Sequence, residues 1–333
     1  MTIDVRELTS PGTRAVTAAA DPAEAAGWAT AAPRKGFFTD TSVCIGCKAC
    51  EVACKEWNAI PDDRAPLTGM SFDNTEHLGA STWRHVAFVE QPAALGRNDT
   101  GLAATALASD PTAGPPASAS GAPDVLALAA SGGTGPDGQP LAPDFRWLMA
   151  SDVCKHCTEA GCLDVCPTGS LFRTEFGTVV VQADICNGCG YCVSACPFGV
   201  IERREDDGRA FKCTLCYDRI GEGLTPACAK ACPTESIQFG DVDELRARAQ
   251  ARLDQLHDRG TTQARLYGED PGDGVGGFGA FFLLLDEPEA YGLPPDPVVP
   301  TRDLPSMWRH AAVAAAVLVG GLAATFLRTR RPR

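Results

Sequence analysis

The sequence is poor in aromatic residues and in positive charge. Aromatic side chains make up 7% of it while Gly, Pro and Ala are abundant, so we do not expect a single deep hydrophobic core and expect cofactors to act as staples. Basic residues number 29 against 42 acidic ones, a net charge of −13. A nucleic-acid surface needs a basic stripe, so this balance argues against nucleic acid as a partner. The 333 residues suffice for one large or two ordinary domains.

The N-terminal region shows neither the apolar core of a signal peptide nor a twin-arginine pair. Residues 1–36 are rich in Ala, Thr and Pro, and we expect them to form a flexible arm. Residues 93–143 are dominated by Ala, Gly, Pro, Ser and Asp without any period. Such a stretch buries too little apolar surface to offset its ordering entropy, which predicts a low-complexity insertion.

Cysteine, by contrast, is plentiful and regularly spaced. The 16 cysteines form four runs of four. The run Cys186, Cys189, Cys192, Cys196, followed by Pro197, has the spacing of a ferredoxin-type 4Fe-4S site, in which the fourth cysteine binds a second cluster. The other runs are Cys44, Cys47, Cys50, Cys54; Cys154, Cys157, Cys162, Cys166; and Cys213, Cys216, Cys228, Cys232. Four 4Fe-4S clusters would use every thiol.

Disulfides and zinc are the alternatives for so many cysteines. The regular CxxC grouping and the prolines that follow three of the runs disfavour disulfides. Zinc sites usually close with two CxxC pairs, but a zinc-stapled interaction module stays open as a different class of function. A cluster bound by four thiolates has no open iron and transfers single electrons. We therefore expect an electron-transfer subunit without catalytic residues of its own.

Short predicted elements separate the cysteine runs. They are a helix over 50–57, strands over 81–90 and 145–149, hairpins turning at Gly177 and at Asp207 and Gly208, and an amphipathic helix that Asp241 and Glu244 would cap. The order of cluster loop, helix, hairpin and cluster loop occurs twice. This repeat predicts an α+β fold with two ferredoxin-like units over residues 37–260, followed by an extension and linker over 261–307.

Two side chains lie between ligand cysteines of the second run. Lys155 would raise the potential of a neighbouring cluster, because a cation or donor beside a cluster stabilises its reduced state. We expect His156 to be a loop residue and not a ligand, since sulfur already fills every cluster position.

The C-terminal region predicts a transmembrane helix over residues 308–328. Residues 311–327 are uncharged and apolar, and as a helix they would be about 25 Å long, close to the hydrocarbon thickness of a bilayer. Trp308 suits an interfacial anchor, and several arginines follow in a basic tail over 329–333. The positive-inside rule then predicts a cytoplasmic C-terminus and an extracytoplasmic cluster domain. A surface or buried helix of a soluble complex is the alternative.

Four segments resemble a known family: TSVCIGCKACEVACKEWN, VCKHCTEAGCLDVCPTGS, ICNGCGYCVSACPFGVIERREDDGRAFKCTLCYDR and PACAKACPTESIQFG. They are similar to the iron-sulfur (beta) subunit of membrane-bound, respiratory formate dehydrogenase. The resemblance implies a catalytic alpha subunit with a molybdenum or tungsten pterin, a cytochrome b gamma subunit that passes electrons to quinone, and contact with membrane lipid. Without an export signal here, the cluster domain would cross the membrane folded, with a partner that carries one.

The resemblance also implies which cysteines share a cluster. The sets are Cys44, Cys47, Cys50 and Cys232; Cys54, Cys213, Cys216 and Cys228; Cys154, Cys157, Cys162 and Cys196; and Cys166, Cys186, Cys189 and Cys192. The equivalent subunit of a nickel-iron hydrogenase, or of a nitrate, polysulfide or sulfoxide reductase, stays an alternative because ligand spacing does not separate these proteins. The segments CKEWN and EDPGDGVGG favour formate dehydrogenase over hydrogenase.

Overall fold

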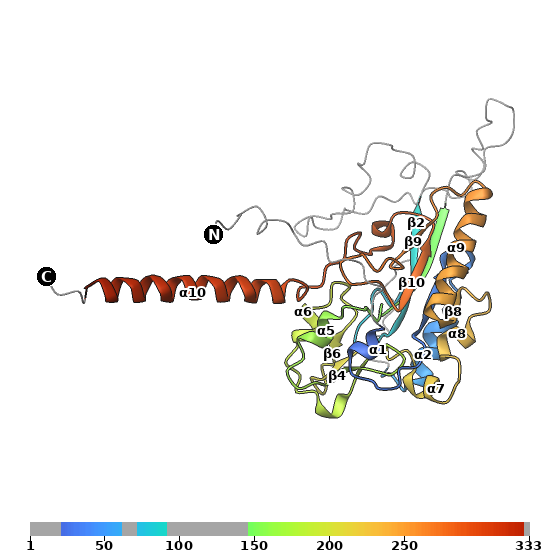
Figure 1. The fold of residues 1–333 in the computed structure, drawn as a ribbon. Helices are drawn as coiled ribbons and strands as arrows, with labels where there is room; N and C mark the ends of the chain where they lie inside the picture. Colours follow the sequence, from blue (N-terminus) through green and yellow to red (C-terminus); the bar gives the residue numbers. More distant parts are fainter. Residues whose placement is uncertain (1–20, 62–71, 92–145, 330–333) are drawn as a thin grey trace, which may run out of the picture.

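The computed structural model describes residues 21–61, 72–91 and 146–329. The predicted low-complexity insertion, the first 20 residues and residues 330–333 lie outside this part. At the centre is a four-stranded sheet in the order β8-β1-β10-β9 (Figure 1). Its strands are β1 (Lys35–Asp40), β8 (Ile237–Asp241), β9 (Arg265–Tyr267) and β10 (Ala280–Leu284). β1 runs parallel to β10 and antiparallel to β8.

Most of the aromatic residues near this sheet are buried, and β10 is buried along its whole length. Phe38 of β1 stacks on Phe281 of β10 with ring centroids 5.5 Å apart. Helix α9 (Val242–Asp258) packs on the sheet through Leu245, Ala249 and Leu256, which share one helical face. The amphipathic-helix prediction is therefore confirmed.

The predicted capping role of Asp241 is wrong. This residue does precede α9, but its side chain makes no capping hydrogen bond. Lys35 Nζ instead donates to Asp241 Oδ1 at 2.5 Å across the β1–β8 pair. The Asp241 carboxylate, which the sequence pattern predicted would cap α9, therefore pairs with Lys35 of the neighbouring strand instead.

Three antiparallel pairs lie around the central sheet. They are β2 (Arg84–Gln91) with β3 (Arg146–Val153), β4 (Leu171–Arg173) with β5 (Val179–Val181), and β6 (Glu202–Arg203) with β7 (Ala210–Phe211). The turns of the two short hairpins contain Gly177 and Gly208, whose φ angles are 72° and 70°. Both hairpin predictions are confirmed. Glycine suits these turn positions because it adopts a positive φ without a Cβ clash.

The remaining helices within the body of the protein are short. They are α1 (Pro22–Ala25), α2 (Ala49–Trp57), α5 (Gly161–Asp164), α6 (Tyr191–Ser194), α7 (Tyr217–Gly221) and α8 (Ala227–Ala231), with 3-10 turns η2 (Thr41–Val43), η4 (Ala183–Ile185) and η5 (Pro288–Tyr291). Most of them flank cysteines. The body thus consists of one central sheet and many small elements that position loops.

Two predicted boundaries differ from the structure. The flexible arm expected over 1–36 is wrong for residues 21–36, because Ala32 N donates to Glu175 O at 3.1 Å and Arg34 Nη1 donates to Thr158 Oγ1 at 2.9 Å. The extension expected over 261–307 contributes β9 and β10 to the central sheet. Both contacts join segments far apart in the chain, where local composition carries no signal.

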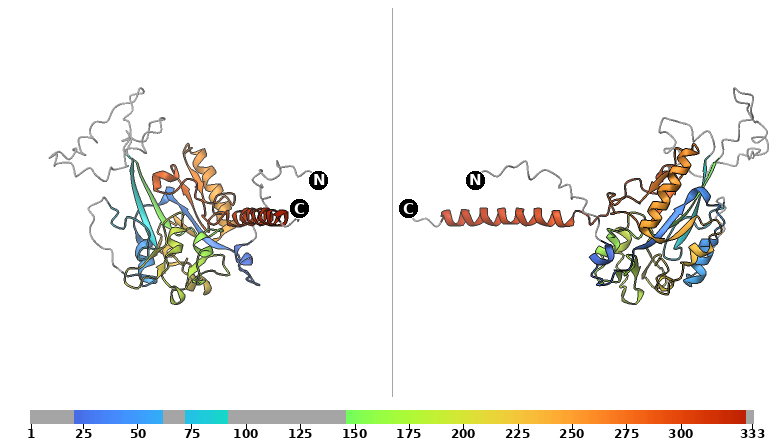
Figure 2. Two further views of the ribbon diagram at one scale, coloured as in Figure 1. Left: turned by 90° about the vertical axis from the view of Figure 1, so that its left-hand side faces the viewer. Right: turned by 45° about the vertical axis from the view of Figure 1, so that its right-hand side comes forward.

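Helix α10 (Leu304–Thr329) extends away from the body as a single straight rod, as Figure 2 shows from two further directions. Its residues Ser306–Phe326 are 21 residues of apolar helix with none of that window buried. In the part of the chain that the structure describes, it is the one helix long and apolar enough to cross a membrane, by length and composition alone.

We expect Gly36→Ala to destabilise the central sheet. A Cβ at this position would lie 2.0 Å from Gly279 O, the carbonyl that accepts the hydrogen bond from Phe37 N. Overpacking of this kind costs about 2 kcal/mol of unfolding free energy, so the midpoint of heat-induced loss of visible absorption should fall by about 5 °C.

The matched control is Gly240→Ala, because Gly240 lies opposite Gly36 on β8 and its Cβ would meet Leu245 at an ordinary 3.9 Å. We expect this variant to unfold within about 1 °C of wild type. Equal midpoints for the two variants would contradict the close approach of β1 to Gly279.

Candidate metal centres

The cysteine runs lie in loops that lead directly into short helices. Cys50 and Cys54 lie one turn apart on α2, and Cys228 lies on α8. Cys162 and Cys192 lie on α5 and α6. All sixteen cysteines are described and none forms a disulfide. Each loop holds the early cysteines of a run, and the helix after it directs the last one elsewhere.

Cys54 lies beside the fourth run and not beside the start of its own. Burial raises the pKa of Cys54 well above its ordinary value, and the nearby Cys213, Cys228 and Cys216 raise it further. Burial likewise raises the pKa of Cys213 to about 12. The last cysteine of the first run therefore lies among the first three of the fourth.

The opposite end of the fourth run lies beside the first. Burial raises the pKa of Cys44, and its neighbours Cys232 and Cys47 raise it further. Cys50 follows in the same loop and helix, where burial raises its pKa to about 11. The first and fourth runs thus exchange their last cysteines.

The second and third runs show the same exchange. Burial raises the pKa of Cys157 strongly, with Cys154, Cys162 and Cys196 adding to the shift. For Cys192, burial raises the pKa to about 11, and Cys186, Cys189 and Cys166 contribute.

We refer below to the four cysteine sets that the resemblance implies as groups 1 to 4. Group 1 is Cys44, Cys47, Cys50 and Cys232; group 2 is Cys54, Cys213, Cys216 and Cys228; group 3 is Cys154, Cys157, Cys162 and Cys196; group 4 is Cys166, Cys186, Cys189 and Cys192. The structure places Cys44 near Cys47 and Cys232, Cys54 among three thiols of group 2, Cys157 among three of group 3 and Cys192 among three of group 4, while the thiol beside Cys50 is Cys228. Interactions between Cys50 and Cys228, Cys213 and Cys154, and Cys162 and Cys192 connect consecutive groups. The groups therefore form a row.

The number and kind of side chains in each group fit a cluster. Each group offers four thiols, and a 4Fe-4S cluster takes one sulfur ligand at each of its four irons. Among the described residues, no three His, Cys, Asp or Glu side chains converge closely enough to hold a single metal ion.

Arg84 of β2 is a buried cation between groups 1 and 2. Its Nη2 donates to Cys228 Sγ at 3.2 Å, and its Nη1 donates to Ser151 O at 3.1 Å. Ser151 Oγ lies 3.2 Å from Cys50 Sγ. Burial lowers the pKa of Arg84, but the nearby thiols Cys228, Cys50 and Cys213 together outweigh burial and the net shift is upward. Such a cation suits a cluster, which is anionic when four thiolates bind it.

Two buried lysines lie beside group 3. Lys212 Nζ donates to Cys213 O at 2.9 Å; burial lowers its pKa, but Cys154 and other nearby thiols outweigh this and raise it. Lys155 Nζ pairs with the Asp152 carboxylate and lies 4.8 Å from the centroid of the Phe282 ring. Sequence reasoning identified Lys155 and missed Lys212 and Arg84. Lys212 directly precedes Cys213 in the sequence, a signal that could have been used, whereas Arg84 lies far from any cysteine run.

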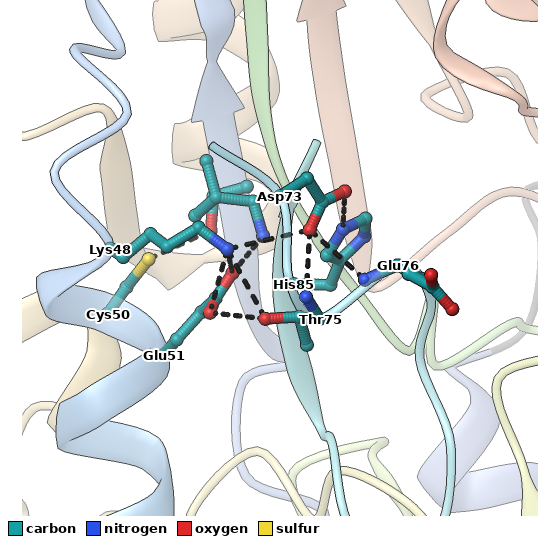
Figure 3. A network of polar contacts seen from close by, with 9 residues as sticks. Lys48, Cys50, Glu51, Asp73, Thr75, Glu76 and His85 are labelled. Atoms are coloured by element: carbon teal, nitrogen blue, oxygen red, sulfur yellow. Dashed lines mark hydrogen bonds and ion pairs between the residues drawn. The ribbon is translucent and has the colours of Figure 1, made fainter. Parts of the chain in front are cut away.

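A polar network holds α2 against β2 (Figure 3). Lys48 Nζ lies 3.3 Å from Glu51 Oε1 and 3.5 Å from Asp73 Oδ1. His85 Nε2 lies 2.7 Å from Asp73 Oδ2, and Thr75 Oγ1 donates to Glu51 Oε2 at 3.1 Å. Burial raises the pKa of Asp73, but the His85 contact and backbone donors lower it more. The network positions the helix that carries two cysteines, from groups 1 and 2.

The first CxxC turn of each cysteine run has the same backbone conformation. The residue before the second cysteine has a positive φ in each of these four turns: Gly46 (64°), His156 (45°), Gly188 (71°) and Leu215 (57°). In the last of these, Leu215 N donates to Cys213 Sγ at 3.3 Å. A backbone hydrogen bond from Gly46 likewise lowers the pKa of Cys44, although burial outweighs it. Such N–H donors stabilise a thiolate.

Comparison with known proteins agrees with this geometry. Residues 145–242 match the sequence model of a 4Fe-4S dicluster domain, and residues 41–57 match that of a 4Fe-4S binding domain. These matches confirm the predicted 4Fe-4S chemistry and the two ferredoxin-type domains.

Three relatives are named for redox complexes. The formate dehydrogenase iron-sulfur subunit of Haemophilus influenzae is 38% identical over 85% of this chain and 76% of its own length. The nitrate-inducible formate dehydrogenase iron-sulfur subunit of Escherichia coli is 35% identical over 86% of this chain and 80% of its own. The B subunit of the anaerobic dimethyl sulfoxide reductase of Escherichia coli is 30% identical over 64% of this chain and 76% of its own. The chain therefore belongs to the family of formate dehydrogenase iron-sulfur subunits.

Proposed function

We propose that this chain conducts electrons from formate oxidation in a catalytic subunit, through four 4Fe-4S clusters, to a membrane partner. Oxidation of formate to carbon dioxide releases a proton and two electrons, and each cluster accepts one electron at a time. The catalytic partner would hold a molybdenum or tungsten pterin, and a cytochrome b subunit would pass the electrons to quinone. The observation that carries the proposal is a row of four thiol groups that ends beside α10.

Each thiol group would hold one cluster. The proposed ligands are Cys44, Cys47, Cys50 and Cys232 for cluster 1; Cys54, Cys213, Cys216 and Cys228 for cluster 2; Cys154, Cys157, Cys162 and Cys196 for cluster 3; and Cys166, Cys186, Cys189 and Cys192 for cluster 4. The interactions among these thiols, together with the buried cations beside them, support the assignment.

The position of α10 gives the row a direction. The segment before this helix packs on α5: Thr301 Oγ1 donates to Asp164 Oδ2 at 2.6 Å, and a Cβ on Gly161 would lie 2.9 Å from Val299. Figure 1 shows α10 starting beside α5 and α6, with α2 farther away. Cluster 4 would thus deliver electrons toward the membrane, and cluster 1 would receive them from the catalytic subunit.

Both ends of the row reach the surface. Cys47 of group 1 and Cys189 of group 4 are exposed. Exposed apolar side chains accompany them, namely Ile45 and Val52 near the first and Ile185 and Tyr191 near the second. Exposed apolar patches beside redox groups suit partner subunits, because docking would bury them and shorten the electron-transfer distance.

We propose that α10 anchors the chain in the membrane as a single span. The window Ser306–Phe326 is about 30 Å long as a helix, which matches the hydrocarbon core. Arg328, Arg330, Arg331 and Arg333 follow it, so the positive-inside rule places the C-terminus in the cytoplasm and the clusters on the other side.

The direct test is to purify the complex from membranes through a tag on this chain. We expect at least about sixteen irons per copy of this chain, since four 4Fe-4S clusters hold that many and the haem of the cytochrome b subunit adds to them, and reduction of an artificial dye with formate but not with hydrogen. Activity with hydrogen or with a sulfoxide instead of formate would indicate a different catalytic subunit. Zinc without iron would overturn the proposal as a whole.

The proposed ligand sets predict which cysteine variants are equivalent. Cys54→Ser and Cys213→Ser should each remove the same electron paramagnetic resonance signal from the dithionite-reduced complex, and the double variant should lose nothing more. Cys44→Ser is the matched control from the run that contains Cys54, and it should remove a different signal. If Cys44→Ser and Cys54→Ser removed the same signal, the four cysteines of one run would bind one cluster and the proposed ligand sets would be wrong.

Deletion of residues 304–333 tests the anchor. We expect the truncated complex to keep its iron and its formate-dependent dye reduction, because α10 lies outside the body, but to lose most of its formate-dependent quinone reduction. Deletion of 330–333 alone serves as the control and should keep both activities. Unchanged quinone reduction in the longer truncation would contradict a role for α10 at the membrane.

A further inference from the structure

His156 has an unusual position among the residues of the CxxC turns. It lies between Cys154 and Cys157, is 1% exposed, and lines a cavity whose walls include all four thiols of group 3. The equivalent residues of the other turns are Gly46, Gly188 and Leu215, none of which has a polar side chain. All four adopt positive φ, a conformation that glycine tolerates best. The second turn therefore keeps an imidazole where glycine would relieve strain.

Hydrogen bonds identify the tautomer of this imidazole. Val179 N donates to His156 Nδ1 at 3.1 Å, so Nδ1 is an acceptor and the ring proton lies on Nε2. His156 Nε2 is buried and has no hydrogen-bond partner within the described residues. A buried N–H donor without an acceptor is rare and costly in native proteins. The site thus presents a neutral donor with no protein acceptor.

The ring is held firmly in place. His156 O accepts from Gly279 N at 3.2 Å and from Arg34 Nη2 at 3.3 Å, while Nδ1 is tied to β5 through Val179. The nearby cations, among them Lys155 and Lys212, supply charge without using Nε2. The need to fill space does not explain why this residue is histidine. Leu215 occupies the equivalent position of the fourth run and is equally buried, at 1% exposed, so an apolar side chain can fill such a position.

We propose that His156 Nε2–H donates a hydrogen bond to a sulfur of the cluster in group 3 and thereby raises its reduction potential. Reduction adds negative charge that spreads over the sulfur atoms, so a donor at this position stabilises the reduced form more than the oxidised form. The other three clusters have no side-chain donor at the equivalent turn position. The inference rests on the proposed ligands of cluster 3, but not on formate as the electron source.

The test is a redox titration of the whole membrane-purified complex, followed by electron paramagnetic resonance, with chemical reductants in place of formate. The variant His156→Leu keeps the side-chain type that the fourth run uses and removes the donor. We expect full iron content, with one of the four midpoints lowered. At the wild-type midpoint, its ratio of reduced to oxidised cluster should fall about tenfold, which equals about 59 mV for one electron.

Two further variants separate hydrogen bonding from packing. His156→Gln retains an N–H donor and should recover part of the shift. Leu215→Gly changes the turn of the fourth run without removing a side-chain donor and should leave the midpoint of cluster 3 unchanged. If His156→Leu loses iron, His156→Gly removes the same donor with the residue that two other turns use.

Two results would overturn the inference. One is full iron content with all four midpoints unchanged in His156→Leu and His156→Gly. The other is an equal shift in His156→Leu and His156→Gln, which would assign the effect to packing. Failure of the proposed catalytic partner is distinguishable, because it would abolish formate activity and leave these titrations unaffected.

Discussion

Burial of clustered sulfur is the constraint on which the rest of the structure depends. Thiolates and the clusters they bind carry negative charge that a protein interior disfavours. Arg84, Lys155 and Lys212 offset this cost from inside the protein, each at 2% exposure or less. Aromatic rings contact two of these cations. The centroid of the Phe37 ring lies 4.9 Å from Arg84 Cζ, and that of the Phe282 ring lies 4.8 Å from Lys155 Nζ. The scarce aromatic residues are thus partly used to hold cations beside sulfur.

Strand pairing and thiol contacts both join the N-terminal part of the described chain to much later segments. In the central sheet, β1 pairs with β8 and β10, so a strand near the start of the described chain lies between two strands near its end. Among the thiols, Cys54 lies with the fourth run and Cys232 lies with the first. Cluster binding would cross-link segments that the sheet already brings together. Cofactor insertion and folding are then coupled, and short helices suffice between the cross-links.

The first CxxC turns of the four cysteine runs show how one backbone conformation accommodates different environments. Their positive φ values are similar, yet the residues at that position are Gly46, His156, Gly188 and Leu215. Neighbouring contacts differ as well, since Arg84 reaches Cys228 of group 2 while Lys212 contacts the backbone of Cys213. A repeated backbone can therefore place its thiols in unequal surroundings, and the charge and hydrogen bonds around a cluster set its reduction potential.

The sequence by itself determined the features that depend on neighbouring residues. Cysteine spacing indicated 4Fe-4S chemistry, Gly177 and Gly208 indicated two hairpins, apolar periodicity indicated α9, and an uncharged apolar stretch indicated α10, because turns, helices and ligand loops are encoded within a few positions. Tertiary structure alone decided that residues 21–36 pack on the body, that β9 and β10 complete the sheet, that Asp241 pairs with Lys35, and that Arg84 lies between two thiol groups. These contacts join distant segments, and their energy exists only when the whole chain has folded.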